Sequence, residues 1–138
     1  MACRQLYYES INNNIELIND IIKKYPQIDV NPGLNGACQS NNIELVRLMI
    51  KCGANNWNSA LNWACYSGNI EITELLIEKG ANDWNAGLFG ACRGGRPNLI
   101  KLMINLGANE LEWGLYYLSA YNHADLANIM FNKKRKRV

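Results

Sequence analysis

The tripeptide Gly-Ala-Asn occurs three times in this chain, and each copy lies 27 residues after the one before it. The copies are Gly53-Ala54-Asn55, Gly80-Ala81-Asn82 and Gly107-Ala108-Asn109. A fixed period of this length indicates one supersecondary unit stacked on copies of itself, because each unit buries its apolar face only against its neighbours. Such a stack presents an extended surface and no enclosed cleft, so we expect a binding function rather than a catalytic one.

The same step connects apolar positions along most of the 138 residues. The repeated positions are Leu34, Leu61, Leu88 and Leu115, then Ala37, Ala64 and Ala91, and then Cys38, Cys65 and Cys92. We predict five units in one domain, residues 1–132, followed by a basic tail, residues 133–138. The units are placed near residues 6–31, 34–58, 61–85, 88–112 and 115–132. The first and last match least well, as is typical of terminal units with one side in water.

Each unit is predicted to be a pair of short antiparallel helices. In the third unit, Leu61, Ala64 and Cys65 have the i, i+3, i+4 spacing of one helical face, and a second apolar stripe follows. The turn between the two stripes is always glycine or asparagine, the residues that adopt a positive φ at least cost. The five turn residues are Asn13, Asn41, Gly68, Gly95 and Asn122. The glycine of each Gly-Ala-Asn copy is expected to end the second helix.

The segment from Ser59 to Asn82 resembles an ankyrin repeat. It aligns without gaps to the family pattern T-P-L-H-x-A-A-x-x-G-x-x-E-x-V-x-x-L-L-x-x-G-A-D. Ankyrin units have about 33 residues, and the residues missing here belong to the β-hairpin finger of that family. The resemblance implies an all-α, ankyrin-like α-solenoid with truncated fingers, in which short loops at 57–60 and 84–87 replace β-structure. The short form, with Asp83-Trp84-Asn85, is similar to repeat proteins of giant DNA viruses.

Two kinds of residue recur in the shortened segment. Trp57 and Trp84 hold the place of a buried Val or Ile in the family, and two interpretations are open. The indoles either cover the junction between stacked helices or form an exposed aromatic ladder for a ligand. The next residues, Asn31, Asn58 and Asn85, are expected to link neighbouring loops by side-chain to backbone hydrogen bonds, each worth about 1 kcal/mol net.

The resemblance also implies where a ligand binds, because partners of the family meet the concave face formed by the loops and the first helices. Matched position by position, the protein-binding residues are Tyr8, Gln39, Ser40, Trp63, Tyr66, Ser67, Arg93, Tyr117 and Tyr121. Tyr, Trp and Arg are typical of interaction hot spots, since they bring a large area with few rotors to freeze. Tyr66 and Arg93 are expected to be exposed. For Trp63, half-burial between first helices is the alternative.

Nothing in the sequence indicates a catalytic residue, a cofactor or a metal site, so we predict that the chain is not an enzyme. His123 is the single histidine and no C-x-x-C is present, which argues against zinc. Gly94-Gly95-Arg96-Pro97 lacks the G-K-[ST] of a phosphate loop. Repeated cysteines in units about 8–10 Å apart are beyond the ~7 Å reach of a disulfide. They are expected to be buried thiols in a reducing compartment.

The predicted location is therefore intracellular, in the cytoplasm, the nucleus or both. The first nine residues contain no apolar core of a secretory signal, and no apolar run approaches the ~18 residues of a membrane span. We expect a monomer without membrane association.

Five of the fourteen basic residues are consecutive near the C-terminus: Lys133, Lys134, Arg135, Lys136 and Arg137. Without them the formal charge changes from +2 to −3, so the remainder of the chain is mildly acidic. Three interpretations are open. The run fits a nuclear-import signal that a carrier protein recognises, a contact with nucleic acid or anionic lipid, or a solvated helix end.

Together these patterns predict a non-enzymatic module that binds a host or cellular protein on its concave face, with nuclear entry through the tail. The alternative is a nucleic-acid-associated protein whose basic tail supplies the affinity. Salt distinguishes the two hypotheses, because phosphate contacts weaken steeply as the salt concentration rises and an apolar interface does not.

Overall fold

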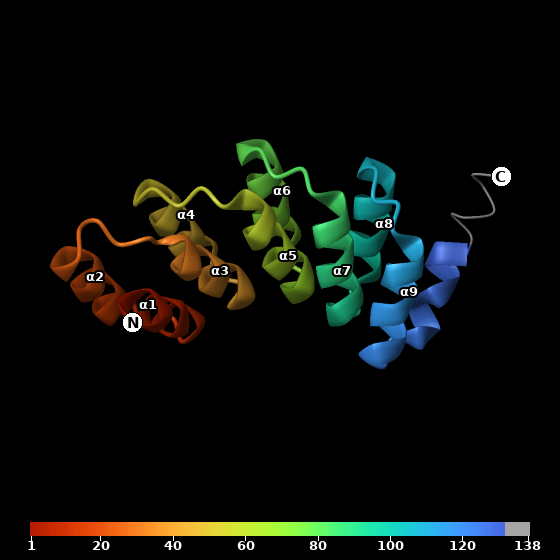
Figure 1. Ribbon diagram of the computed structural model, residues 1–138, viewed down its shortest axis with the longest axis horizontal. Coiled ribbons are helices and arrows are strands. Elements are labelled where there is room, and N and C mark those ends of the chain that lie inside the picture. The colour runs from red at the N-terminus through yellow and green to blue at the C-terminus, as the bar shows by residue number, and fades with distance from the viewer. Residues whose placement is uncertain (132–138) are drawn as a thin grey trace.

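The fold is that of a computed structural model in which residues 1–131 are described (Figure 1). The predicted tail residues 133–137 lie outside the described residues. Five helix pairs follow one another, and no strand occurs between residues 1 and 131. This confirms the predicted all-α solenoid.

The first helices of the five pairs are α1 (Ala2–Ile11), α3 (Asn31–Gln39), α5 (Trp57–Ser67), α7 (Trp84–Gly94) and α9 (Leu111–Ala120). The second helices are α2 (Ile15–Lys24), α4 (Ile43–Lys51), α6 (Ile70–Lys79) and α8 (Pro97–Leu106). In the fifth pair, the 3-10 turn η1 (Ala124–Leu126) leads into helical residues 127–131.

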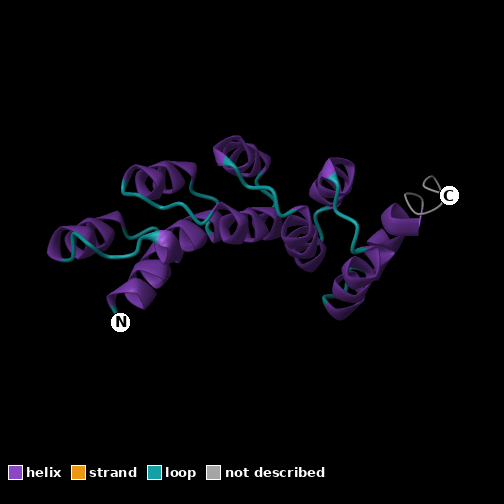
Figure 2. Ribbon diagram, turned by 45° about the horizontal axis from the view of Figure 1, so that its top comes forward, coloured by secondary structure: helices purple, strands orange, loops and turns teal. Residues whose placement is uncertain are grey.

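The pairs form an arc. Figure 2 shows the first helices along its inner, concave side and the second helices along its outer side. Neighbouring first helices are in closer contact than neighbouring second helices, and this difference bends the stack toward the first helices. The concave face is therefore built almost entirely from α1, α3, α5, α7 and α9.

Asparagine and aspartate fix where most helices begin. Asn14, Asn42 and Asn69 precede α2, α4 and α6, and each side-chain oxygen accepts a hydrogen bond from the backbone N–H three residues later. Asn56 and Asp83 cap α5 and α7 in the same way. These two caps correct the predicted loops at 57–60 and 84–87, which are the first turns of α5 and α7. The connecting loops are short, as predicted, but they lie just before Trp57 and Trp84.

The turn residues have the predicted backbone conformation. The non-glycine residues with positive φ among residues 1–131 are Asn13, Asn41 and Asn122, at 57°, 59° and 65°. Gly68 and Gly95 occupy the same place with φ of 82° and 65°. A positive φ is needed here because the chain reverses direction within two residues. Pro97 then begins α8, where its missing N–H costs no helical hydrogen bond.

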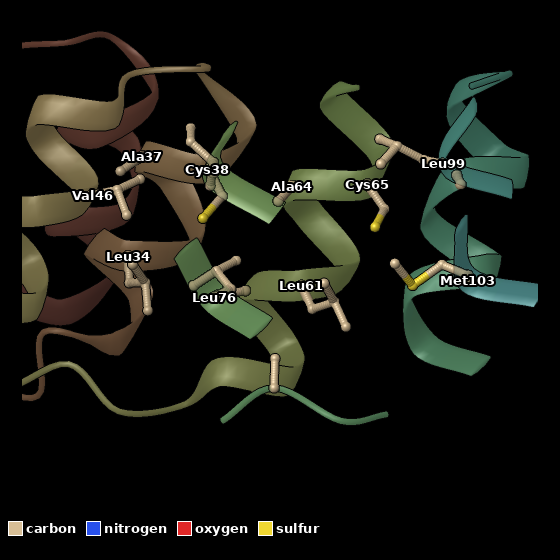
Figure 3. Packing of buried hydrophobic residues seen from close by; sticks show 14 of the residues in the cluster. Leu34, Ala37, Cys38, Val46, Leu61, Ala64, Cys65, Leu76, Leu99 and Met103 are labelled. Carbon is tan, nitrogen blue, oxygen red and sulfur yellow. The ribbon is translucent and has the colours of Figure 1, made fainter. Parts of the chain in front are cut away.

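The core lies between the two rows of helices and continues through the whole stack. Figure 3 shows Leu34 and Leu61 in successive units, with Cys38 and Cys65 beside the core alanines Ala37 and Ala64. The equivalent residues of the fourth unit, Leu88, Ala91 and Cys92, are also fully buried. The repeated cysteines are thus aligned from unit to unit, and small residues are required where first helices pack against second helices.

A ladder of asparagines connects the loops along the stack. Asn58 Oδ1 accepts hydrogen bonds from the backbone N–H of Asn82 at 2.8 Å and of Asp83 at 3.0 Å. Its Nδ2 donates to Asn82 Oδ1 at 3.3 Å. Asn31 and Asn85 make the same three bonds one unit earlier and one unit later. The predicted asparagine links are therefore confirmed, and each ties a first helix to the loop of the next unit.

We predict that Asn58→Ala lowers the free energy of unfolding by about 1–2 kcal/mol, because two backbone N–H groups lose their acceptor. Chemical denaturation followed by circular dichroism measures this loss. The matched control is Asn19→Ala, at an exposed position within α2, which should change stability by no more than about 0.5 kcal/mol. Equal effects of the two substitutions would contradict a structural role for the ladder.

Candidate functional site

One position of the first helix alternates between aromatic residues and glycine along the concave side. Its successive occupants are Tyr8, Gly36, Trp63, Gly90 and Tyr117. Both glycines are buried against the preceding first helix. A methyl group at Gly36 would lie 2.5 Å from the backbone oxygen of Tyr7, and one at Gly90 would collide with the backbone oxygen of Asn62. The glycines let α1 and α3, and α5 and α7, approach closely.

The first aromatic cluster comprises Tyr7, Tyr8, Trp63 and Tyr66. The ring centroids of Trp63 and Tyr66 lie 5.8 Å apart in an edge-to-face arrangement, and those of Tyr7 and Tyr8 lie 5.4 Å apart. Tyr7 reaches Trp63 at 6.3 Å although α3 separates their helices. Gly36 lies between them in register, and its missing side chain lets α3 approach the backbone of α1.

Tyr7 is a member of this cluster that sequence reasoning missed. Its hydroxyl donates a hydrogen bond of 2.6 Å to Gln39 Oε1, so a predicted site residue is held by an unpredicted one. Burial and, secondarily, the neighbouring Tyr8 raise the pKa of Tyr7 from its ordinary value of 10.0. Tyr7 therefore remains a protonated donor at neutral pH and fixes the end of the Gln39 side chain.

Arg93 lies on the first cluster. Its guanidinium carbon is 5.1 Å from the ring centroid of Tyr66 and 5.4 Å from that of Trp63. Nη2 donates to Asn62 Oδ1 at 3.3 Å, and Nε is buried without a hydrogen-bond partner. Arg93, Trp63 and Tyr66 are all half-buried. The expectation of free exposure for Tyr66 and Arg93 is thus corrected, because stacking between α5 and α7 covers part of each side chain.

The second cluster lies at the C-terminal end of the concave side. Phe89 and Tyr117 have centroids 5.2 Å apart, and Tyr116 and Trp113 have centroids 5.8 Å apart. Tyr117 also contacts Tyr116 and, at 6.5 Å, Tyr121. Of the five, Tyr117 and Tyr121 were predicted from the sequence. For Trp113 the available signal was helical spacing, since it precedes Tyr117 by four residues on the same helix. For Phe89 and Tyr116 it was the repeat, since they lie 27 residues apart.

Exposure differs widely among the predicted binding residues. Tyr8 and Tyr121 are exposed by 55% and 48%. Ser40 is half-buried, and its hydroxyl donates to Ala37 O at 3.1 Å and to Asn13 Oδ1 at 3.3 Å. Ser67 is buried, with a hydroxyl that donates to Gln39 O at 3.0 Å. The Ser67 side chain therefore joins the ends of α5 and α3 and offers little surface to a partner, and its role in binding stays a prediction.

The two tryptophans at the helix starts fit the first of the two interpretations given above. Trp57 and Trp84 are half-buried and pack against the hydrophobic core. Each indole also lies near the glycine that ends the second helix of its own unit, Gly80 for Trp57 and Gly107 for Trp84. They cover the end of the core that a longer finger would cover in a full-length repeat.

The described residues contain no cluster of three or more histidine, cysteine or acidic side chains that could hold a metal ion. His123 packs its ring against Gly95. Within residues 1–131, none of the helices combines the length and apolar character that a membrane crossing needs.

A family model for ankyrin repeats, in three copies, matches residues 6–86. The chain belongs to the ankyrin-repeat family. The match covers more than half of the chain, and the structure continues the same helix pairs beyond it through α7, α8 and α9. A search of curated proteins returned no match. Ankyrin repeats are generally protein–protein interaction modules, and the family is typically a non-enzymatic scaffold.

We predict that a chromogenic thiol reagent modifies two of the five cysteines in the native protein, Cys3 and Cys52. All five are free thiols, but Cys38, Cys65 and Cys92 are buried. Burial raises the pKa of these three thiols from 9.0 to about 12, so they stay protonated and unreactive when the pH rises through 9. Titration with the reagent in buffer counts the accessible thiols, and titration in denaturant counts all five. More than two fast thiols in buffer would contradict the aligned core.

Proposed function

We propose that this ankyrin-repeat protein binds a cellular partner protein on the concave face, through the two aromatic clusters. The observation that carries the proposal is the exposure of large rings on the first helices α1 and α9 and directly after α9. Trp113, Tyr116 and Tyr121 are exposed by 57%, 59% and 48%, and Tyr8 by 55%. Burial of such rings against a partner removes much apolar area from water and stabilises the complex.

The clusters are also held in place before a partner arrives. Ring–ring contacts, the Tyr7–Gln39 hydrogen bond and the stacked Arg93 restrict the rotamers of these side chains. A surface that is already ordered loses less conformational entropy on binding, and this favours affinity. Catalysis has no comparable support, and a non-enzymatic role forms part of the proposal.

Photocrosslinking tests the concave face directly. A photoreactive phenylalanine analogue at Tyr121 should give a discrete crosslinked partner in cell extract, which mass spectrometry then identifies. The control places the same analogue at Glu74, an exposed residue of α6 on the outer side of the arc, where no discrete product is expected. The Tyr121 product should also be lost in a variant that combines Tyr66→Ala with Arg93→Ala. A partner captured only from position 74 would contradict the proposal.

The basic run Lys133–Arg137 favours a second role, entry into the nucleus by an import carrier, with nucleic-acid association as the alternative. Removal of residues 133–137 should shift a fluorescent fusion from nucleus to cytoplasm, as microscopy would show. A fusion that carries neutral residues in place of the five cations serves as the control for length. An unchanged distribution of both forms would reject the import role.

A further inference from the structure

Charged residues are distributed very unevenly between the two sides of the arc. The second helices α2, α4, α6 and α8 carry twelve of them: Glu16, Asp20, Lys23, Lys24, Glu44, Arg47, Lys51, Glu71, Glu74, Glu78, Lys79 and Lys101. The first helices α1, α3, α5, α7 and α9 carry four: Arg4 and Glu9 on α1, Arg93 on α7 and Glu112 on α9. Arg96, just beyond the end of α7, donates from Nε to the backbone oxygen of Tyr66 at 3.2 Å, but helices α3, α5 and α7 themselves carry a single charged residue, the cation Arg93.

That cation has no counter-ion within residues 1–131. Its guanidinium plane rests near two aromatic rings, and an amide oxygen of Asn62 accepts one of its five N–H groups. Nε is buried and unpaired. Stacking on rings removes water from the faces of a guanidinium, so a carboxylate in its plane gains more from pairing with it than it would with a fully hydrated arginine.

We propose that the partner bound on the concave face presents a peptide segment with one aspartate or glutamate side chain among apolar residues, and that this carboxylate pairs with Arg93. The inference rests on the proposed function and specifies its partner. The apolar neighbours pack on Trp63, Tyr66 and the C-terminal cluster. The carboxylate accepts hydrogen bonds from the terminal Nη groups of the guanidinium, since Nε is buried.

The same observations disfavour a nucleic acid on this face. Nucleic-acid binding depends on several cations that neutralise successive phosphates. Helices α3, α5 and α7 together supply one cation, Arg93. A single arginine in an aromatic surface suits one carboxylate, and it leaves a run of phosphates unpaired.

A displayed library of random short peptides, selected on the full chain, tests the proposal. Enriched peptides should share an acidic residue flanked by apolar or aromatic residues. Their affinity, measured by fluorescence anisotropy, should fall by about tenfold to a hundredfold with Arg93→Gln, because a charge-assisted pair is lost. Arg93→Lys should restore part of the affinity, since lysine keeps the charge without the planar fork. Arg47→Gln, an exposed arginine of α4 on the outer side, is the matched control and should leave the affinity unchanged.

A change on the peptide guards against an unfolded variant. Replacement of the acidic residue by its amide should weaken binding as much as Arg93→Gln does, and the two changes together should add less than about twofold. The proposed pairing of a carboxylate with Arg93 would be overturned by enriched peptides that lack an acidic residue. It would also be overturned by peptides that bind Arg93→Gln and wild type with equal affinity. If such peptides still lose affinity with Tyr66→Ala, the concave face remains the binding surface. Peptides indifferent to Tyr66→Ala as well would overturn both proposals.

A labelled single strand of oligothymidylate at low salt completes the test. Wild type and Arg93→Gln should bind it equally, because the proposed site takes a carboxylate. If oligothymidylate binding is lost with Arg93→Gln, the proposed peptide partner would be overturned in favour of a nucleic acid.

Discussion

Each helix pair of this chain can bury its apolar face only against the next pair, and the structure follows from that dependence. Leucine, alanine and cysteine repeat in register because each has to meet its own copy across a constant spacing. The asparagine ladder fixes the position of one unit on the next, because hydrogen bonds are directional and apolar packing is not. One asparagine side chain accepts hydrogen bonds from two backbone N–H groups in the following loop. With the finger shortened, these bonds and the half-buried Trp57 and Trp84 replace the contacts that a β-hairpin would supply.

The alternation of aromatic residues and glycine converts this regular stack into a differentiated surface. A buried glycine at positions 36 and 90 lets two first helices meet backbone to backbone. Large residues of neighbouring units contact one another beside these close approaches. Trp63 reaches back to Tyr7, and Arg93 reaches back to Trp63 and Tyr66. The proposed binding surface thus lies where particular first helices approach closely.

Features that depend on the backbone of a single unit could be predicted from the sequence. The turn residues with positive φ and the aligned core belong to this class, because both follow from local residue type and period. Features that depend on contacts between units could be predicted only in part. The asparagine links follow the repeat, whereas the burial of Ser67 and the contact of Arg93 with Tyr66 depend on which residues of the neighbouring unit each side chain meets. The early start of α5 and α7 was missed because Asn56 and Asp83 act as caps one residue before the tryptophan.

The segregation of charge bears on how such a surface remains specific. Charged side chains on the outer helices keep that side hydrated and disfavour its burial, since each charge would have to be desolvated or paired. An aromatic concave face without charge would accept many apolar partners with little discrimination. One guanidinium at its centre penalises every partner that leaves it unpaired, because Arg93 would lose water without gaining a carboxylate. A single charge in an apolar surface therefore selects among partners more strongly than the same charge on the outer helices could.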